Sequence, residues 1–203
     1  MDYESLLELV KKRRSIRAFT DQPVTDEMVE KVIEAARWAP SGANSQPWEF
    51  IVIRDQATKD QIATWALEQM RFAHEAEMTR PQALRWPSVA RPVSGPPFFK
   101  NTPVLILVIG DPRVSKSFPL LTYQERRDEN LVSALASAFL YMTLAATSLG
   151  LGSHWASMVA GPFMSAMVAD LLGIPEGYHI YDMMGLGFPA MEPKPRLVRD
   201  RDA

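Results

Sequence analysis

A short basic segment near the start of the chain is the first place where the sequence could do chemistry. Arg13, Arg14 and Arg17 lie within five residues of one another, with Ser15 between them. Guanidinium groups pair with phosphate through parallel hydrogen bonds, and a serine hydroxyl adds a further donor. The segment could therefore bind a phosphate, or it could be the solvated end of a basic helix.

A loop further along carries groups that could contact a flat polar ring. Residues 40–48 read Pro-Ser-Gly-Ala-Asn-Ser-Gln-Pro-Trp, which combines two hydroxyls, two amides and an indole. Hydroxyl and amide groups can hydrogen bond to the edge of such a ring. The same composition also fits an ordinary loop, because Pro40 would end the helix that precedes it.

The end of the chain forms a second basic segment. Gly187, Phe188 and Pro189 are followed by Pro-Lys-Pro-Arg at residues 193–196, so Lys194 and Arg196 lie on a stiff tail. Basic residues from the two ends of the chain could converge on one anion. Taken separately, they would be solvated faces or a frayed terminus.

Other kinds of chemistry lack support in the sequence. The absence of cysteine excludes disulfides, thiolate metal ligands and a cysteine nucleophile. His74, His154 and His179 are far apart, so we expect no metal site and interpret His154 as a packed residue. The Gly-Leu-Gly runs at 150–152 and 185–187 open no helix after a strand, so neither is a dinucleotide-binding fingerprint.

Composition bounds the class of protein. The 203 residues are 47% apolar and 23% charged with a formal net charge of -2, which suits one globular domain over residues 1–203 and calls for neither nucleic acid nor an anionic membrane. Residues 131–169 contain no Asp, Glu, Lys or Arg, but alanine, serine and threonine dilute their hydropathy. We expect a helix buried in a core or subunit interface there, no membrane span, no signal peptide and a cytoplasmic location.

The elements that position these groups follow from apolar spacing. We expect helices from Tyr3 to the basic run, from the N-cap Thr25 to Pro40, and at residues 58–79, 128–149 and 161–173, with strands at 50–53, 104–109 and 178–186. Residues 81–100 are rich in proline and predict a lid, a binding loop or a disordered segment, and residues 115–127 predict another loop. Because the order lacks a regular βαβ alternation, it favours a central sheet between helical layers over a doubly wound nucleotide fold.

Together, the three loop segments resemble the nitroreductase family of FMN enzymes. The run Arg-Arg-Ser-Ile-Arg-Ala-Phe at 13–19, the run Ala-Pro-Ser-Gly-Ala-Asn-Ser-Gln-Pro-Trp at 39–48 and the ending Gly-Phe-Pro-Ala…Pro-Lys-Pro-Arg occur in the order typical of that family. The run Gly-Leu-Gly-Ser-His-Trp at 150–155, after the long alanine-rich helix, does so too. The resemblance spans nearly the whole chain and implies an α+β fold: a three-layer α/β/α sandwich with a mixed, mostly antiparallel sheet, in an intertwined homodimer.

The resemblance also implies a phosphate site. Arg13 and Ser15 match family positions that bind the ribityl phosphate of FMN, with Arg14 adding backbone or side-chain contacts. Lys194 and Arg196 match the tail residues that close on that phosphate.

The flavin ring would be held by three further segments. Arg17 matches the basic residue near the pyrimidine edge, and Pro40, Ser41, Gly42 and Asn44 match the loop that contacts the flavin from the other subunit. The segment Ala156, Ser157 and Met158 matches the one whose backbone N–H faces flavin N5, although it departs from the commoner glycine and Pro-Ile-Glu-Gly patterns.

The implied activity is hydride transfer from NADH or NADPH through FMN to a small, flat, oxidised acceptor such as a nitroaromatic or a quinone. The flavin carries this chemistry, so no side chain is needed as acid, base or nucleophile, and Arg17 would stabilise negative charge on the ring. Three alternatives stay open. The same fold could serve reductive dehalogenation or flavin fragmentation, as in 5,6-dimethylbenzimidazole synthase; the chain could bind flavin without turnover; or it could be an unrelated structural domain.

Overall fold

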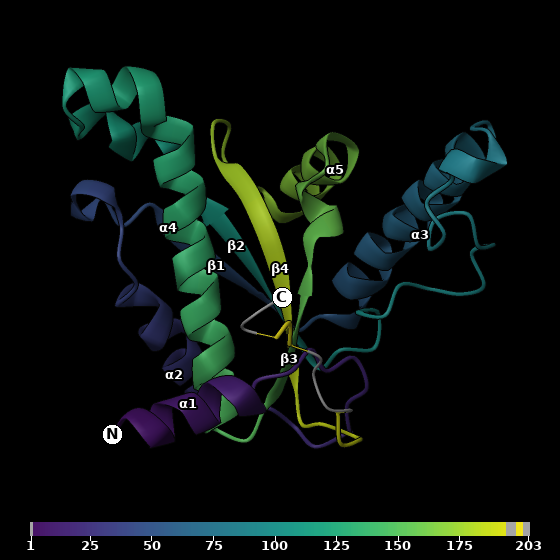
Figure 1. The fold of residues 1–203 in the computed structure, drawn as a ribbon, viewed down its shortest axis with the longest axis horizontal. Helices are drawn as coiled ribbons and strands as arrows, with labels where there is room; N and C mark the ends of the chain where they lie inside the picture. Colours follow the sequence, from purple (N-terminus) through teal and green to yellow (C-terminus); the bar gives the residue numbers. More distant parts are fainter. Residues whose placement is uncertain (1, 194–197, 201–203) are drawn as a thin grey trace.

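Three layers of helix and strand make up the chain in a computed structural model that describes residues 2–193 and 198–200 (Figure 1). The helices are α1 (Tyr3–Lys12), α2 (Asp26–Arg37), α3 (Gln56–Met78), α4 (Leu120–Ser148) and α5 (Pro162–Leu172). The strands are β1 (Trp48–Ile53), β2 (Val104–Gly110), β3 (Gly152–Ala156) and β4 (His179–Gly187). Short 3-10 turns lie at Gly42–Asn44 (η1), Gln82–Leu84 (η2), Pro112–Ser117 (η3) and Ser157–Ala160 (η4).

The four strands form one sheet in the order β1-β2-β4-β3, and every neighbouring pair is antiparallel. The three strands predicted from the sequence are present, and β3 is a fourth that the sequence analysis missed. Its residues, Gly-Ser-His-Trp-Ala, show neither the apolar run nor the alternation that reveals a strand. Outside the strands, a parallel bridge joins Ser15 to Ser153.

The central strand β2 divides the core into two. Val104, Ile106 and Val108 face a cluster shared with α2 and α4, whereas the alternate residues Leu105 and Leu107 face a cluster shared with α3 and α5. Each such side chain is fully buried and stabilises the fold by about 1.5–3 kcal/mol. Helices therefore cover both faces of the sheet, which confirms the predicted α/β/α sandwich.

Several helix ends lie where the sequence placed them. The Oγ1 of Thr25 accepts a hydrogen bond from the Met28 backbone N–H at 3.3 Å, which caps α2. Helix α5 begins with Pro162 and ends at Gly173, whose φ of 63° is the left-handed conformation that favours glycine at this position.

Two predictions about helices need correction. Residues 115–127 are not a loop, because η3 covers their start and α4 begins at Leu120, not near Asp128. Most of residues 120–127 favour helix, but these turns are largely exposed and therefore lack the burial pattern that reveals one. Helix α1 forms as predicted, yet no residue in it is buried, and Tyr3 and Leu6 are exposed.

Helix α4 is, within the described part of the chain, the one helix long and apolar enough to cross a membrane. Half of its most apolar window is buried in the structure, where Ala134, Ala138 and Phe139 pack into the core shared with α2 and the sheet. It is therefore a core helix of this fold, as the small residues in it predicted.

Candidate functional site

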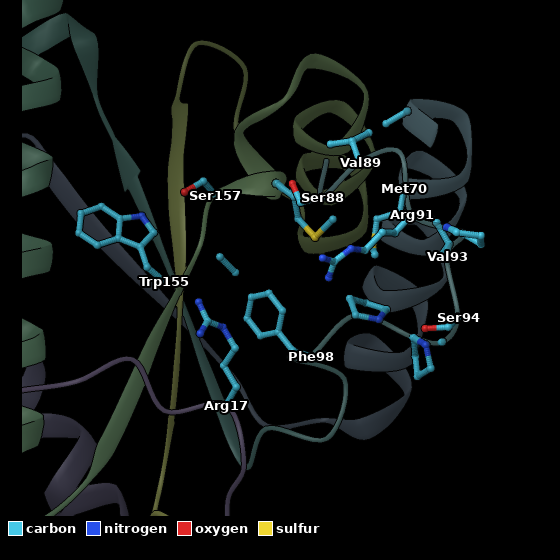
Figure 2. Close-up of a pocket in the computed structure, with 17 residues that line it drawn as sticks. Arg17, Met70, Ser88, Val89, Arg91, Val93, Ser94, Phe98, Trp155 and Ser157 are labelled. Atoms are coloured by element: carbon cyan, nitrogen blue, oxygen red, sulfur yellow. The ribbon is translucent and has the colours of Figure 1, made fainter. Parts of the chain in front are cut away.

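Two of the predicted site segments meet at one cavity of about 610 Å³ (Figure 2). Arg17 lines it from the basic run, and Ala156, Ser157 and Met158 line it from the end of β3 and the start of η4. Residues 88–98, within the segment predicted to be a lid, form much of the opposite wall together with Met70 of α3.

The basic run is fixed to the edge of the sheet. The Ile16 backbone N–H donates to the Ser153 oxygen at 2.8 Å, and a Cβ on Gly152 would lie 2.8 Å from the Ile16 side chain. Side chains alternate in extended chain, which agrees with Ile16 being buried while Ser15 and Arg17 are exposed. The alternation puts Ser15 and Arg17 on one face, whereas Arg13 is the half-buried C-cap residue of α1.

Arg14 lies on the other face of this run. Its side chain lines a separate groove of about 180 Å³ together with Gly150, Pro189 and Pro193. The structure therefore does not bring the Arg14 side chain into the cavity that Arg17 lines.

The start of the basic tail lies beside the basic run. Thr20 N–H donates to the Phe188 oxygen at 2.9 Å, Ala190 N–H donates to the Ala18 oxygen at 3.0 Å, and a bridge joins Phe19 to Pro189. The two ends of the chain thus converge as far as they are described. Lys194 and Arg196, predicted to complete the phosphate site, lie outside the described residues.

His154 forms the packed base beneath the cavity. It is buried, its Nδ1 lies 2.9 Å from the Ile16 oxygen, and a Cβ on Gly185 would come within 2.0 Å of its ring. Burial, with a smaller contribution from the nearby Arg17 charge, lowers the pKa of His154 to about 4 against the opposing effect of the hydrogen bond to Ile16. His154 is therefore neutral at pH 7 and a packed residue, as the sequence predicted.

The buried Asp182 side chain accepts a hydrogen bond from Trp155, the residue that follows His154 in β3. The Trp155 indole N–H donates to Asp182, and the Trp155 ring stacks on Phe139 with ring centroids 3.9 Å apart. Burial raises the pKa of Asp182, while hydrogen bonds from Trp155 and Ser157 partly offset the shift. Two cavity-lining residues, Trp155 and Ser157, thus share one buried acceptor.

Neither Asp182 nor Trp155 was found by sequence reasoning. No motif surrounds Asp182. The one available signal was a single aspartate within the mostly apolar strand β4.

The lid segment closes over this wall through Phe98. The Arg17 guanidinium carbon lies 5.1 Å from the centre of the Phe98 ring, a cation–π distance, and the same ring packs edge-on against His154 at 4.8 Å. The proline content predicted the segment, but it gave no indication of which side chains turn inward.

The loop at residues 40–47 does not reach the cavity that Arg17 lines. Gly42 and Ala43 line a different cavity with Phe118 and Asn130, beside the start of α4, and Figure 1 shows η1 and α3 on opposite sides of α4. A single chain therefore does not bring Pro40, Ser41, Gly42 or Asn44 to Arg17.

The same loop is locally strained. Ala43 and Asn44 each have a φ of 52° and Gln46 has a φ of 46°, left-handed values that are costly for residues other than glycine. The Ser41 hydroxyl accepts a hydrogen bond from the Gln46 N–H at 3.0 Å and holds the turn. Strain of this kind clusters at binding sites, which makes the loop a candidate contact for something outside this chain.

The described residues offer no set of ligands for a metal ion. Within residues 2–193 and 198–200, no group of three or more His, Asp or Glu side chains is placed to hold a metal ion. The cavity that holds Arg17 and Arg91 has no carboxylate in its lining. The arrangement suits a flat, partly anionic organic molecule, seated against a sheet edge and covered by a lid.

Fold and cavity together define an α+β protein with a small-molecule site at the edge of an antiparallel sheet. Residues 10–188 match the model of the nitroreductase family, and the chain belongs to that family. It is 32% identical, over 93% of its own length and 88% of the relative's, to a protein of Archaeoglobus fulgidus that is provisionally named NADH dehydrogenase/NAD(P)H nitroreductase.

Solved structures give the same fold. A BluB-like flavoprotein from Clostridium difficile 630 matches with a TM-score of 0.75 and 27% identity, over all of this chain and 96% of that one. An iodotyrosine deiodinase bound to FMN and 3-iodo-L-tyrosine matches with a TM-score of 0.74 and 28% identity, over 97% and 95%. The chain is therefore an oxidoreductase of this family, and its relatives span more than one reaction.

Proposed function

We propose that this chain binds FMN and transfers hydride from NADH or NADPH to a small, flat, oxidised acceptor such as a nitroaromatic or a quinone. The observation that carries the proposal is the meeting of Arg17 and residues 156–158 in one cavity, although at least 139 positions of sequence separate them. The family match supports it further.

The lining fits FMN by its chemistry. FMN combines a flat apolar ring, a polar pyrimidine edge and an anionic phosphate. The cavity offers Met70, Met158 and Phe98 as apolar walls, the Arg17 guanidinium as a cation, and no carboxylate that would repel an anion. Arg13 and Ser15, which precede Arg17 in the same basic run and do not themselves line the cavity, would hold the phosphate, with Lys194 and Arg196 closing from the tail.

When bound, FMN supplies a ring that accepts and returns a hydride at N5. Arg17 would fix a positive charge at the pyrimidine edge, where negative charge gathers on reduction, and so stabilise the reduced form without reorganising. The backbone of Ala156, Ser157 and Met158 would orient the ring, with Asp182 holding Ser157 and Trp155 in place. The lid at residues 81–100 would exclude water from one face.

A homodimer would complete this site. The strained 40–47 loop lies away from Arg17 in its own chain, so it would contact the flavin only from a second copy. Exposed apolar residues on α1 and α4, among them Leu6, Val132 and Leu140, give such a copy a surface to cover. We place this dimer in the cytoplasm.

The direct test is the visible spectrum of the purified protein, followed by anaerobic titration with NADH and NADPH. The proposal expects bound FMN that bleaches with either donor and recovers its colour when a nitroaromatic or quinone is added. A colourless protein with no affinity for FMN would overturn it, and so would bound FMN that neither donor reduces. A monomer that retains FMN on size-exclusion would overturn the dimer alone.

Two relatives favour a second candidate reaction on the same fold. Because a deiodinase and a BluB-like flavoprotein align over almost the full chain, reductive dehalogenation and oxygen-dependent flavin fragmentation are the alternatives. Iodide release from iodotyrosine would support dehalogenation, whereas loss of flavin during turnover in air would support fragmentation.

A further inference from the structure

The cavity contains a second guanidinium that the proposed FMN contacts do not use. Arg91 lines it from the lid segment, and Figure 2 shows the Arg17 and Arg91 side chains entering from opposite walls, with Phe98 between them in that view. Arg17 belongs to the wall formed by the sheet edge, whereas Arg91 belongs to the wall that covers it. A ligand stacked between these walls would meet Arg91 on the side away from the sheet.

The backbone beside Arg91 is anchored, so its position is set by the fold. His74 of α3 donates from Nδ1 to the Val89 oxygen at 3.0 Å, and the Ala90 N–H donates to the Trp86 oxygen at 2.9 Å. Trp86 is held in turn, because its backbone N–H donates a hydrogen bond to the Glu77 carboxylate at 2.6 Å. These contacts fix the residues immediately before Arg91 to the C-terminal half of α3.

The surroundings of Arg91 select the chemistry of the ligand. The rest of the lid wall is mostly apolar, with Val89, Pro92, Val93 and Pro97 in the lining beside the neutral Ser88 and Ser94, and no aspartate or glutamate lines the cavity. A guanidinium that faces an apolar slot without a carboxylate favours a flat ring that carries one anionic group. A planar carboxylate can accept both parallel N–H bonds of the guanidinium fork.

From this arrangement we infer that Arg91 is a specificity-determining residue that binds the carboxylate of an aromatic acid acceptor in the cavity. The inference rests on the proposed function and names its acceptor class: aromatic carboxylates in preference to neutral aromatics of the same shape. An anionic phosphate on the nicotinamide donor has related chemistry, and the test separates the two.

The test uses the FMN-loaded protein and a pair of matched ligands. Benzoate and benzamide share size and shape but differ in charge, and neither is reduced, so their dissociation constants can be measured by titrating the flavin absorbance or the tryptophan emission. We expect benzoate to bind at least tenfold more tightly than benzamide, and this preference to shrink as ionic strength rises. Equal affinity for the two ligands would overturn the inference.

Substitution then assigns the preference to Arg91. Arg91→Gln should reduce the benzoate-to-benzamide affinity ratio about tenfold or more, and Arg91→Lys should give an intermediate ratio because it keeps the charge but loses the fork. Arg71→Gln is the matched control, since Arg71 is exposed on α3 beside Met70 and does not line the cavity. An unchanged ratio in Arg91→Gln would contradict the assignment.

Turnover distinguishes a failed inference from a failed function. The ratio of kcat/KM for 4-nitrobenzoate to that for 4-nitrobenzamide should exceed one in the wild type and fall in Arg91→Gln. If both acceptors are reduced equally well, the proposed function stands and the inference fails; if neither is reduced, the proposed function fails while the benzoate titration still tests Arg91. A rise in KM for NADPH but not NADH, with the acceptor ratio intact, would assign Arg91 to the donor phosphate and overturn the inference.

Discussion

The Nδ1 of His154 lies 2.9 Å from the backbone oxygen of Ile16, so one buried hydrogen bond joins β3 to the basic run that carries Arg17. A carbonyl oxygen only accepts, and therefore Nδ1 must carry the proton of the neutral ring. Within the described residues, the other nitrogen of that ring, Nε2, is buried without a hydrogen-bond partner. The backbone that carries Arg17 is thus held by a buried histidine whose second nitrogen has no partner for a further proton.

This arrangement predicts a loss of stability in acid. Because the pKa of His154 is lowered to about 4 in the folded chain from an ordinary value of 6.5, the unfolded chain takes up a proton at higher pH than the folded chain does. The contribution is complete above pH 6.5 and is lost as the pH falls toward 4, to the extent of about 2–3 kcal/mol. The measurement is the free energy of unfolding in urea at pH 7.5 and 4.5.

The control for this prediction is His154→Asn, whose amide nitrogen can still donate to Ile16 but does not titrate. The variant should be less stable than wild type at pH 7.5, because ring packing is lost, and the gap should close by about 2–3 kcal/mol at pH 4.5. A gap that stays constant between the two pH values would show that His154 takes up its proton as readily in the folded state as in the unfolded one.

Gly185 is predicted to be indispensable because of the same ring. A Cβ at this position would lie 2.0 Å from His154 Cε1, and the bond to Ile16 restrains the ring from moving away. We expect Gly185→Ala to cost about 3 kcal/mol or more of unfolding free energy, or to prevent folding. Gly95→Ala is the matched control, since nothing lies within 4 Å of its Cβ position.

A double variant keeps this prediction testable where the single one fails to fold. His154→Ala removes the ring, so adding Gly185→Ala in that background should cost much less than it does in wild type. Equal costs in both backgrounds would mean that the clash with His154 is not the reason for the glycine.

Asp182 is predicted to tolerate an amide better than an apolar group. Burial raises the pKa of Asp182 in the folded state, so the folded protein gains stability relative to the unfolded chain as the pH falls through that raised pKa. Asp182→Asn can keep both hydrogen bonds and should be as stable as wild type, or more stable by about 1 kcal/mol, at pH 7. The difference should shrink as the pH falls, because the protonated carboxyl of the wild type is then neutral like the amide.

The contrasting variant, Asp182→Leu, removes the acceptor of the Trp155 and Ser157 donors, both of which are partly open to solvent in the cavity, and should cost about 0.5–1.5 kcal/mol for each lost hydrogen bond. Urea unfolding followed by tryptophan fluorescence measures both variants. If Asp182→Asn lowers the free energy of unfolding by more than about 2 kcal/mol at pH 7, burial of the charged carboxylate does not destabilise the wild type at this position.

Much of the fold could be predicted because its signals are local. Val104–Gly110 is apolar throughout since helices cover both faces of the sheet, and Thr25 and Gly173 mark helix ends by their own side-chain and backbone chemistry. Strand β3 was missed because it pairs on one side with β4 and is packed through glycine, serine and histidine. The first turns of α4 were missed because they are largely exposed, so apolar residues do not recur there with the spacing of a helix.

The candidate site could be predicted less completely, for a different reason. Arg17 lies in a basic run whose composition is itself informative, whereas residues 156–158 were expected only from the family resemblance; the structure brings both to one cavity. Asp182, Phe98 and Arg91 gain their roles from long-range packing, which places a strand residue and two lid residues beside segments far away in the sequence. No local pattern encodes such an encounter.

Arg17 provides the sharpest prediction about the redox chemistry of the proposed flavoprotein. Its guanidinium is exposed in the cavity and rests on Phe98, so Arg17→Gln should leave the fold and its unfolding free energy within about 0.5 kcal/mol of wild type. Removing a fixed positive charge beside the pyrimidine edge should lower the midpoint potential of bound FMN. A charge-assisted hydrogen bond of about 1.5–3 kcal/mol corresponds to roughly 30–65 mV for a two-electron couple.

Spectroelectrochemical titration measures this shift in midpoint potential. The control for loss of one positive charge is Lys11→Gln, because Lys11 is exposed in the last turn of α1. If Arg17→Gln and Lys11→Gln shift the potential equally, Arg17 acts only through the overall charge of the protein and not at the edge of the ring.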